Sequence, residues 1–163
     1  MKQAVIVSTA RTPIGKAYRG ALNNTEAPTF AAHAITHAVE RAGIEAGEAE
    51  DVILGCALPQ GTTGYNVGRM SALAAGMPVT VAGMTIDRQC SSGMMAIATG
   101  AKQVINDGMN IVVAGGLESI SLVQNEHQNT HRQQDPTVLN HAEHAYMSMI
   151  ETAETVAKRY GIS

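Results

Sequence analysis

Apolar residues follow two alternating patterns along the chain. Nearly continuous apolar runs of strand length cover residues 3–10, 50–58, 80–87 and 110–119. Between these runs, apolar positions recur at the spacing of one helix face over residues 29–42, 66–76 and 91–107. Short continuous apolar runs are typical of strands that are buried on both faces. Because strands and helices alternate up to residue 119, the pattern predicts an α/β layered fold with a largely parallel sheet.

Capping and turn residues mark where these helices begin and end. Thr29 is expected to cap the first helix, and Gly43 is expected to end it. Gly76 and Pro78 stop the second helix, and Gly108 closes the third.

The pattern changes after residue 121. The next stretch is polar and has little periodicity, and helical spacing returns only in residues 150–161. We therefore expect two parts, residues 1–120 and residues 121–163, the second being the start of an inserted domain. The polar stretch carries four histidines without an accompanying cysteine or carboxylate cluster, so we expect a solvated loop and no metal site: His127, His131, His141 and His144.

Composition favours a folded domain and disfavours a nucleic-acid-binding, membrane or secreted protein. With 45% apolar and 15% charged residues in 163, the chain is expected to fold around a buried core. With a net charge of −3, the chain has no excess of positive charge that would indicate binding to nucleic acid or to an anionic membrane. The apolar run near the N-terminus is too short for a signal peptide, and no run reaches the length of a membrane span. Two cysteines do not form a disulfide framework, so we expect free thiols and a cytoplasmic location.

Cys90 is the candidate for chemistry, because it stands where the third strand gives way to the third helix. The thiolate is the reactive form of cysteine, and the free N–H groups at a helix N-terminus favour an anion or a developing oxyanion there. Ser91 and Ser92 are expected to cap the helix, and Gly93 would allow a close backbone approach. Spacing alone leaves a second interpretation open, that of a small buried core residue. Cys56, inside an apolar run, is expected to be such a core residue.

Four segments carry a resemblance to a known family. They are "AVIVSTARTPIGKAYRGAL" near the N-terminus, "DRQCSSGMMAI" around Cys90, "VAGGLESIS" after the fourth strand and "ETAETVAKRYGIS" at the end. In order and spacing they resemble segments of the thiolases, the acyl-CoA acetyl- and acyltransferases of fatty acid metabolism. The resemblance covers essentially the whole chain.

The resemblance implies a fold and a reaction. The fold is a thiolase-like layered α/β fold, in which one βαβαβαβ half has a mixed sheet between helix layers and is followed by the start of the inserted loop domain. Thiolases cleave a 3-ketoacyl-CoA with free CoA, or condense two acyl-CoAs in reverse. Cys90 matches the acylated nucleophile, and its backbone N–H matches one oxyanion donor. Coenzyme A is then a substrate, and no covalently bound cofactor is expected. A homodimer or homotetramer is implied, formed through residues 80–87, with no nucleic acid or membrane partner.

Some family residues are missing from these 163 residues. The Asn-Glu-Ala-Phe, Gly-His-Pro and second Cys-x-Gly motifs of thiolases do not occur in the sequence. They supply the base, the rest of the oxyanion hole and the acid of the second step, so we expect this chain alone to lack turnover. Met149 matches a residue of the acyl and pantetheine pocket. Ser148 and Ile150 replace the family's His and Gly beside it, which leaves a longer acyl chain, or a packing role for Met149, open.

Two other interpretations remain. One is a β-ketoacyl synthase or hydroxymethylglutaryl-CoA synthase relative, which shares the layered fold and a cysteine at the same junction. The segment "ARTPIGK" and the Thr-Ala-Glu helix favour a thiolase instead. The other is a non-catalytic, dimer-forming half-thiolase, which the missing motifs favour.

Overall fold

A computed structural model describes residues 2–163 and divides the chain into two compact units, Met1–Gln128 and Asn129–Ser163. The first unit holds the sheet and its covering helices. The second unit is helical.

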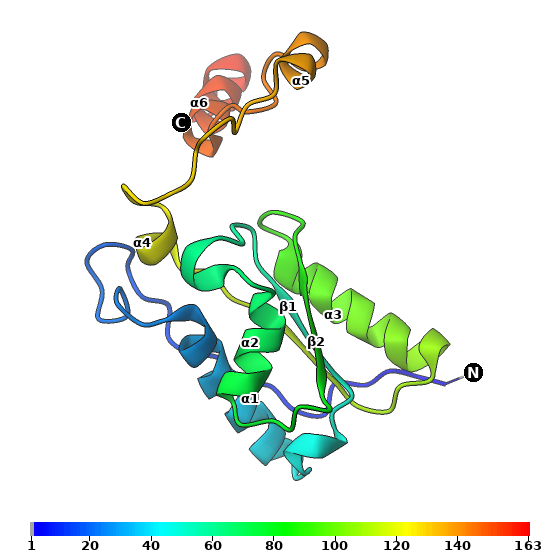
Figure 1. The fold of residues 1–163 in the computed structure, drawn as a ribbon. Coiled ribbons are helices and arrows are strands. Elements are labelled where there is room, and N and C mark those ends of the chain that lie inside the picture. The colour runs from blue at the N-terminus through cyan, green and yellow to red at the C-terminus, as the bar shows by residue number, and fades with distance from the viewer. Residues whose placement is uncertain (1) are drawn as a thin grey trace. The chain divides into compact units, whose positions relative to one another are not determined.

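The sheet of the first unit has three parallel strands among the described residues, β1 (Asp51–Gly55), β2 (Ala82–Ile86) and β3 (Val112–Gly116). The strand order is β2-β1-β3, so β1 is central (Figure 1). Every residue of β1 is buried, as its continuous apolar run predicted. The α/β class with a parallel sheet is confirmed.

Helices cover both faces of this sheet. α1 (Ala27–Ala42) and α2 (Val67–Ala74) lie on one face, where Val52 and Leu54 of β1 enter the same core as Ile35. Successive strand residues point to opposite faces, so Asp51 and Gly55 face the other way. There they meet α3 (Ser92–Lys102), whose helical path continues as a π-helical turn, Gln103–Asp107.

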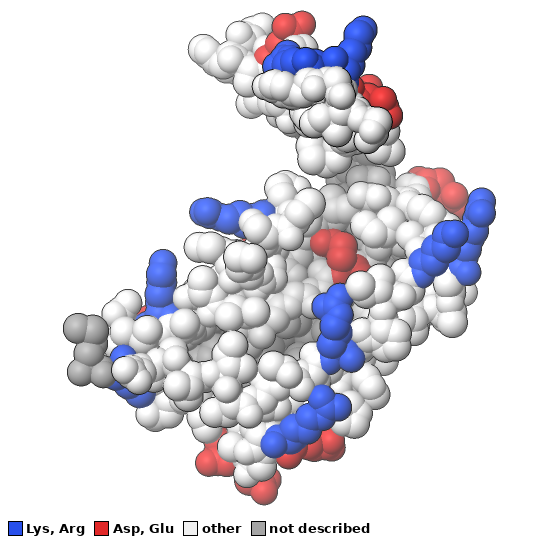
Figure 2. Space-filling model, turned by 180° about the vertical axis from the view of Figure 1, so that it is seen from behind, with Lys and Arg blue, Asp and Glu red and all other residues white. Residues whose placement is uncertain are grey.

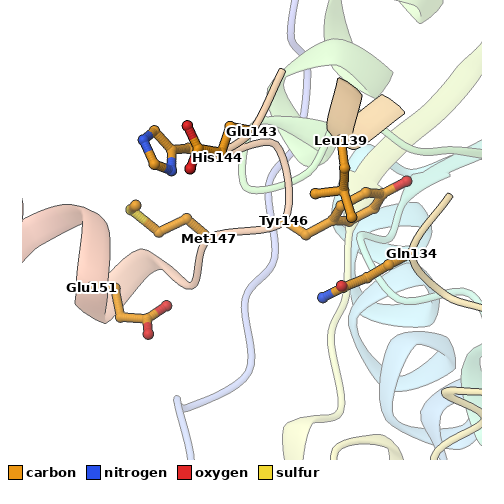
Figure 3. A pocket seen from close by; sticks show the side chains of 7 residues that line it. All are labelled: Gln134, Leu139, Glu143, His144, Tyr146, Met147 and Glu151. Atoms are coloured by element: carbon orange, nitrogen blue, oxygen red, sulfur yellow. The ribbon is translucent and has the colours of Figure 1, made fainter. Parts of the chain in front are cut away.

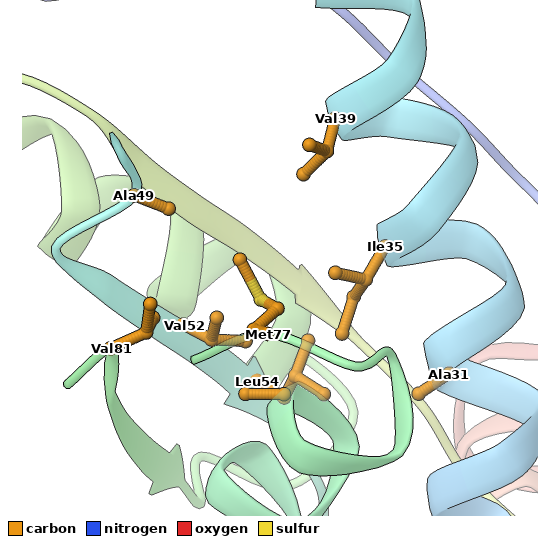
Figure 4. Packing of buried hydrophobic residues seen from close by; sticks show 9 residues of the cluster. Ala31, Ile35, Val39, Ala49, Val52, Leu54, Met77 and Val81 are labelled. Carbon is orange, nitrogen blue, oxygen red and sulfur yellow. The ribbon is translucent and has the colours of Figure 1, made fainter. Parts of the chain in front are cut away.

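The main core lies between β1 and the layer of α1 and α2 (Figure 4). Val52 is fully buried, and Leu54 and Ile35 are each 4% exposed. Burying a side chain of this size is worth about 1.5–3 kcal/mol relative to leaving it exposed. The stripe predicted for the first helix is therefore the side that packs on the sheet.

The predicted strand at residues 3–10 is wrong. Residues 2–16 form neither helix nor strand, and Val5, Ile6 and Val7 are each about three-quarters exposed. Polar contacts tie the segment to the rest of the unit, such as the one from the Arg41 guanidinium to the Thr9 carbonyl oxygen (2.8 Å). A run of apolar residues becomes a strand only where another strand offers it hydrogen bonds, and no described strand pairs with this one. The expected βαβαβαβ order and the antiparallel member of a mixed sheet are therefore not present in residues 2–163.

The capping residues predicted from the sequence mark the ends of α1 and of the third helical segment, but the predicted start of α1 is wrong. α1 begins at Ala27, before the expected cap at Thr29, and Pro28 lies in its first turn, where the fixed φ of proline suits a helix. Gly43 ends α1 in the left-handed conformation (φ 68°), as expected. Gly108 closes the third helical segment in the same way (φ 84°).

Short helices complete the described chain. Two 3₁₀ turns, Ala46–Glu48 and Gly61–Thr63, and α4 (Ile120–Val123) belong to the first unit. The second unit contains α5 (Pro136–His141) and α6 (Met149–Tyr160). On the face that Figure 2 shows, basic side chains lie in several separate places and do not form one continuous stripe.

Candidate active site

The Cys90 thiol is exposed in the turn that joins β2 to α3. The turn is tight, and Gln89 takes a left-handed backbone conformation (φ 48°) directly before the cysteine. Non-glycine residues rarely adopt this conformation, and they keep it only where the surrounding structure holds them in place. The junction predicted from the sequence is therefore a constrained turn that presents a thiol to solvent.

Hydrogen bonds from Ser92 hold this turn. Its buried hydroxyl accepts from the Arg88 N–H (2.8 Å) and donates to the Gln89 carbonyl oxygen (2.5 Å). The Asp87 carboxylate accepts from the Gln89 N–H (2.8 Å). Ser91 stands at the N-cap of α3 but makes no side-chain cap hydrogen bond, so the expected capping by the serines is wrong. Ser92 instead bonds to Arg88 and Gln89, the two residues before Cys90.

Glycines bring the start of α3 into backbone contact with the sheet. A Cβ added to Gly55 would lie 2.1 Å from the Ser92 carbonyl carbon, and one added to Gly116 would lie 3.0 Å from the Gly93 Cα. The approach is possible only because both positions are glycine, which has no side chain. The close backbone approach expected at Gly93 is present, but the glycines that it requires are Gly55 and Gly116, because a Cβ on Gly93 would lie 3.6 Å from the Gly116 Cα. The approach places the helix start at the carboxyl ends of β1 and β3.

This geometry suits thioester chemistry. α3 is an 11-residue helix, and its N-terminal N–H groups and dipole favour negative charge beside Cys90. An exposed thiol in such a place is accessible to an electrophilic carbonyl.

Cys56 has the opposite environment. It is 1% exposed, directly after β1, and its thiol donates to the Glu118 carboxylate (Sγ to Oε1, 3.4 Å). Burial, with the neighbouring Glu118 charge, raises the pKa of Cys56 to about 11, against a partly opposing hydrogen bond from the Leu58 backbone. The thiolate is therefore disfavoured, and the prediction that Cys56 is a core residue is confirmed.

Glu118 has a structural role that the sequence did not predict. Its second carboxylate oxygen accepts from the Ala57 N–H (2.8 Å). The motif "VAGGLESIS" contained this glutamate, but nothing in the spacing linked it to residues more than sixty positions earlier.

Met149 lies in the second unit, at the start of α6, and is 69% exposed. A pocket of about 340 Å³ lies in the same unit (Figure 3), lined by Gln134, Leu139, Glu143, His144, Tyr146, Met147 and Glu151. Met149 is not among the lining residues. Its assignment to an acyl pocket stays a prediction.

Neither a metal-binding cluster nor a membrane-spanning helix occurs among the described residues. No group of three or more His, Cys, Asp or Glu side chains in residues 2–163 is arranged to hold a metal ion. None of the helices in that range has the length and apolar character needed to cross a membrane.

Comparison with known proteins decides the family. A family model described as "Thiolase, N-terminal domain" matches residues 4–163. The chain belongs to the thiolase family. It is 40% identical to the 3-ketoacyl-CoA thiolase of Bacillus subtilis over all of this chain and 41% of that relative. It is 43% identical to the acetyl-CoA acetyltransferase of Rhizobium meliloti over 72% of this chain and 30% of that relative.

A solved structure gives the same result. The crystal structure of the Bacillus anthracis acetyl-CoA acetyltransferase matches with a TM-score of 0.80 and 40% identity, covering all of this chain and 43% of that one. The chain thus spans about two-fifths of the length of these thiolase relatives. These matches favour a thiolase over a β-ketoacyl synthase relative.

Proposed function

We propose that Cys90 is the acyl carrier of a thiolase reaction, acyl-CoA:acetyl-CoA C-acyltransfer. The observation that carries the proposal is the exposed Cys90 thiol at the N-terminus of α3, in a chain whose other cysteine is buried. The relatives are named as thiolases and acetyl-CoA acetyltransferases, which supports acyl-CoA and CoA as the substrates.

In the thiolytic direction, the Cys90 thiolate attacks the 3-keto carbon of a 3-ketoacyl-CoA. The bond between C2 and C3 breaks, and the electron pair leaves on C2, which takes a proton to give acetyl-CoA. The acyl group stays on Cys90 as a thioester until the thiolate of free CoA removes it. The condensation runs through the same acyl-Cys90 in reverse. The Cys90 N–H serves as one donor to the oxyanion.

These 163 residues do not contain the base and acid motifs that the resemblance implies. We therefore propose that the chain alone exchanges thioesters without completing a catalytic cycle. We further propose a cytoplasmic homodimer or homotetramer, and Met149 as part of the acyl pocket in the complete site.

Intact-mass measurement after incubation with acetyl-CoA tests the proposal. We expect one acetyl group on Cys90 of the wild-type chain and none on Cys90→Ala, with Cys56→Ala acetylated like wild type. We also expect no CoA-dependent cleavage of acetoacetyl-CoA by the chain alone. Absence of acetylation would favour the non-catalytic, dimer-forming half-thiolase.

A further inference from the structure

Three chain segments meet at the carboxyl end of β1, and Glu118 joins two of them. Its carboxylate accepts from the Ala57 N–H (2.8 Å) and from the Cys56 thiol (3.4 Å). Because Glu118 follows β3 and Ala57 follows β1, one side chain connects the ends of two neighbouring strands. We name this contact, from the Glu118 carboxylate to Cys56 and Ala57, the Glu118 clasp.

The same end of β1 is bonded to the segments on both sides of it. The Cys56 N–H donates to the Ile86 carbonyl oxygen (3.0 Å), directly before the turn that carries Cys90. The Leu117 N–H donates to the Gly55 carbonyl oxygen (3.0 Å). The ends of all three strands are thus connected within the residues adjoining the clasp.

The start of α3 rests on this connected end. The backbone of Ser92 and Gly93 touches Gly55, with no side chain between them to absorb a displacement. Ser92 in turn holds Arg88 and Gln89, the two residues before Cys90. A shift at the end of β1 therefore passes through backbone contacts to the turn that aims the thiol.

We propose that Glu118 is a positioning residue, whose clasp on Cys56 and Ala57 fixes the end of β1 and thereby the N-terminus of α3 behind Cys90. The inference rests on the proposed function for its role in acyl transfer. The thiol reactivity that it predicts is measurable without any acyl-CoA. The clasp also keeps the Cys56 thiol protonated as a hydrogen-bond donor, so that Cys56 does not act as a nucleophile.

The test measures the rate at which iodoacetamide alkylates Cys90, by peptide mass spectrometry, in the folded 163-residue chain. Glu118→Ala removes the clasp and the charge. Glu118→Gln removes the charge but keeps an acceptor oxygen for the Ala57 N–H. We expect Cys90 to be alkylated about two- to fivefold more slowly in Glu118→Ala than in Glu118→Gln. The reason is that loss of the clasp displaces the N-terminus of α3 from its place beside the thiol.

Glu50→Ala is the matched control. The Glu50 carboxylate also accepts from a backbone N–H, that of Asn110 (2.6 Å), but at the amino end of the same sheet. Its loss removes a bond from a backbone N–H far from Cys90 and should leave the Cys90 rate at the wild-type value. If Glu118→Ala does not fold, Glu118→Asp replaces it, because the shorter carboxylate keeps its charge and loses reach. Cys90 of Glu118→Asp should then be alkylated more slowly than Cys90 of the wild-type chain.

Equal Cys90 rates in Glu118→Ala and Glu118→Gln, or an equal slowing by Glu50→Ala, overturn the inference. In the Glu118→Asp comparison, a wild-type rate overturns it. Acetylation by acetyl-CoA is followed in the same samples. A wild-type chain that alkylates normally but does not acetylate refutes the proposed function and leaves the clasp result standing.

Discussion

Gly55, in the central strand, and Ser92, at the first turn of α3, are in direct backbone contact: a Cβ on Gly55 would lie 2.1 Å from the Ser92 carbonyl carbon. The two residues are far apart in the sequence and belong to different layers. Their contact fixes where α3 starts, and therefore where Cys90 is presented.

Gly55→Ala should displace α3. The added methyl overlaps backbone atoms that cannot rotate away, so we expect a loss of about 3 kcal/mol or more in the free energy of unfolding, measured in urea. Gly115→Ala is the control, because a Cβ there meets only the Leu54 side chain at 3.8 Å. It should stay within about 1 kcal/mol of wild type. Equal stability of the two variants would contradict the contact.

Ser92→Ala should loosen the turn before Cys90. It leaves the Arg88 N–H and one bond to the Gln89 carbonyl oxygen unmade, and we expect a destabilisation of about 1–3 kcal/mol. Ser91→Ala removes only an exposed hydroxyl bond to the Arg88 carbonyl oxygen (2.9 Å), so its effect should be less than about 0.5 kcal/mol. Urea unfolding of both variants checks this, and a larger effect at Ser91 would reverse the assignment of the two serines.

The two thiols should differ in reactivity. Cys90 is exposed beside a helix N-terminus, whereas Cys56 is buried and its pKa is raised to about 11. At pH 8 we expect iodoacetamide to modify Cys90 at least about tenfold faster than Cys56, because the Cys90 thiol is accessible, whereas burial hides the Cys56 thiol and disfavours its thiolate. Peptide mapping over a time course measures both rates. Equal rates in the folded chain would show that neither burial nor the helix dipole acts as described, and urea-unfolded chain is the reference in which the rates should converge.

Burial of Cys56 should make stability fall in alkali. Its pKa is raised in the folded chain from 9.0 to about 11, so the unfolded chain loses the proton first as the pH rises. The stabilisation is complete below about pH 9 and is lost between about pH 9 and 11, with a magnitude of order 2 kcal/mol. The difference between wild type and Cys56→Ala, by urea unfolding across this range, isolates the contribution. A difference that does not change with pH would contradict it.

The second unit should lose helix in acid. Ser148 and Glu151 form a capping box at the start of α6, and hydrogen bonds from Ser148 lower the pKa of Glu151 below its usual 4.5. A lowered pKa gives stabilisation that is present above about pH 4.5 and is lost as the pH falls through the folded value. Glu151→Gln should reduce far-ultraviolet helicity at pH 7 and flatten its decline in acid, because it removes the carboxylate that accepts from the N–H and the hydroxyl of Ser148. Glu154→Gln on the same helix is the control, and it should keep the wild-type acid profile.

Much of the fold was predictable because it depends on local pattern. The continuous run around residue 53 became the buried central strand, and the apolar stripe containing Ile35 became the packed face of α1. Gly43 and Gly108 end helices because glycine adopts the left-handed conformation without strain. The candidate site was predictable only as a junction: the spacing placed Cys90 between a strand and a helix.

The N-terminal run shows where local pattern fails. Val5, Ile6 and Val7 have the residue types of a buried strand and are exposed, because a strand requires a partner that the run does not itself supply.

The sequence by itself therefore determined the α/β layers, the place of Cys90 at a strand-to-helix junction and the family to which the chain belongs. Only the tertiary structure decided that Ser92 acts back on Arg88 and Gln89, and that Glu118 connects the ends of β1 and β3. The physical reason is distance along the chain. Apolar periodicity and turn residues act over a few positions, whereas the contacts that aim the thiol join segments up to about sixty residues apart, and these meet only when the layers pack.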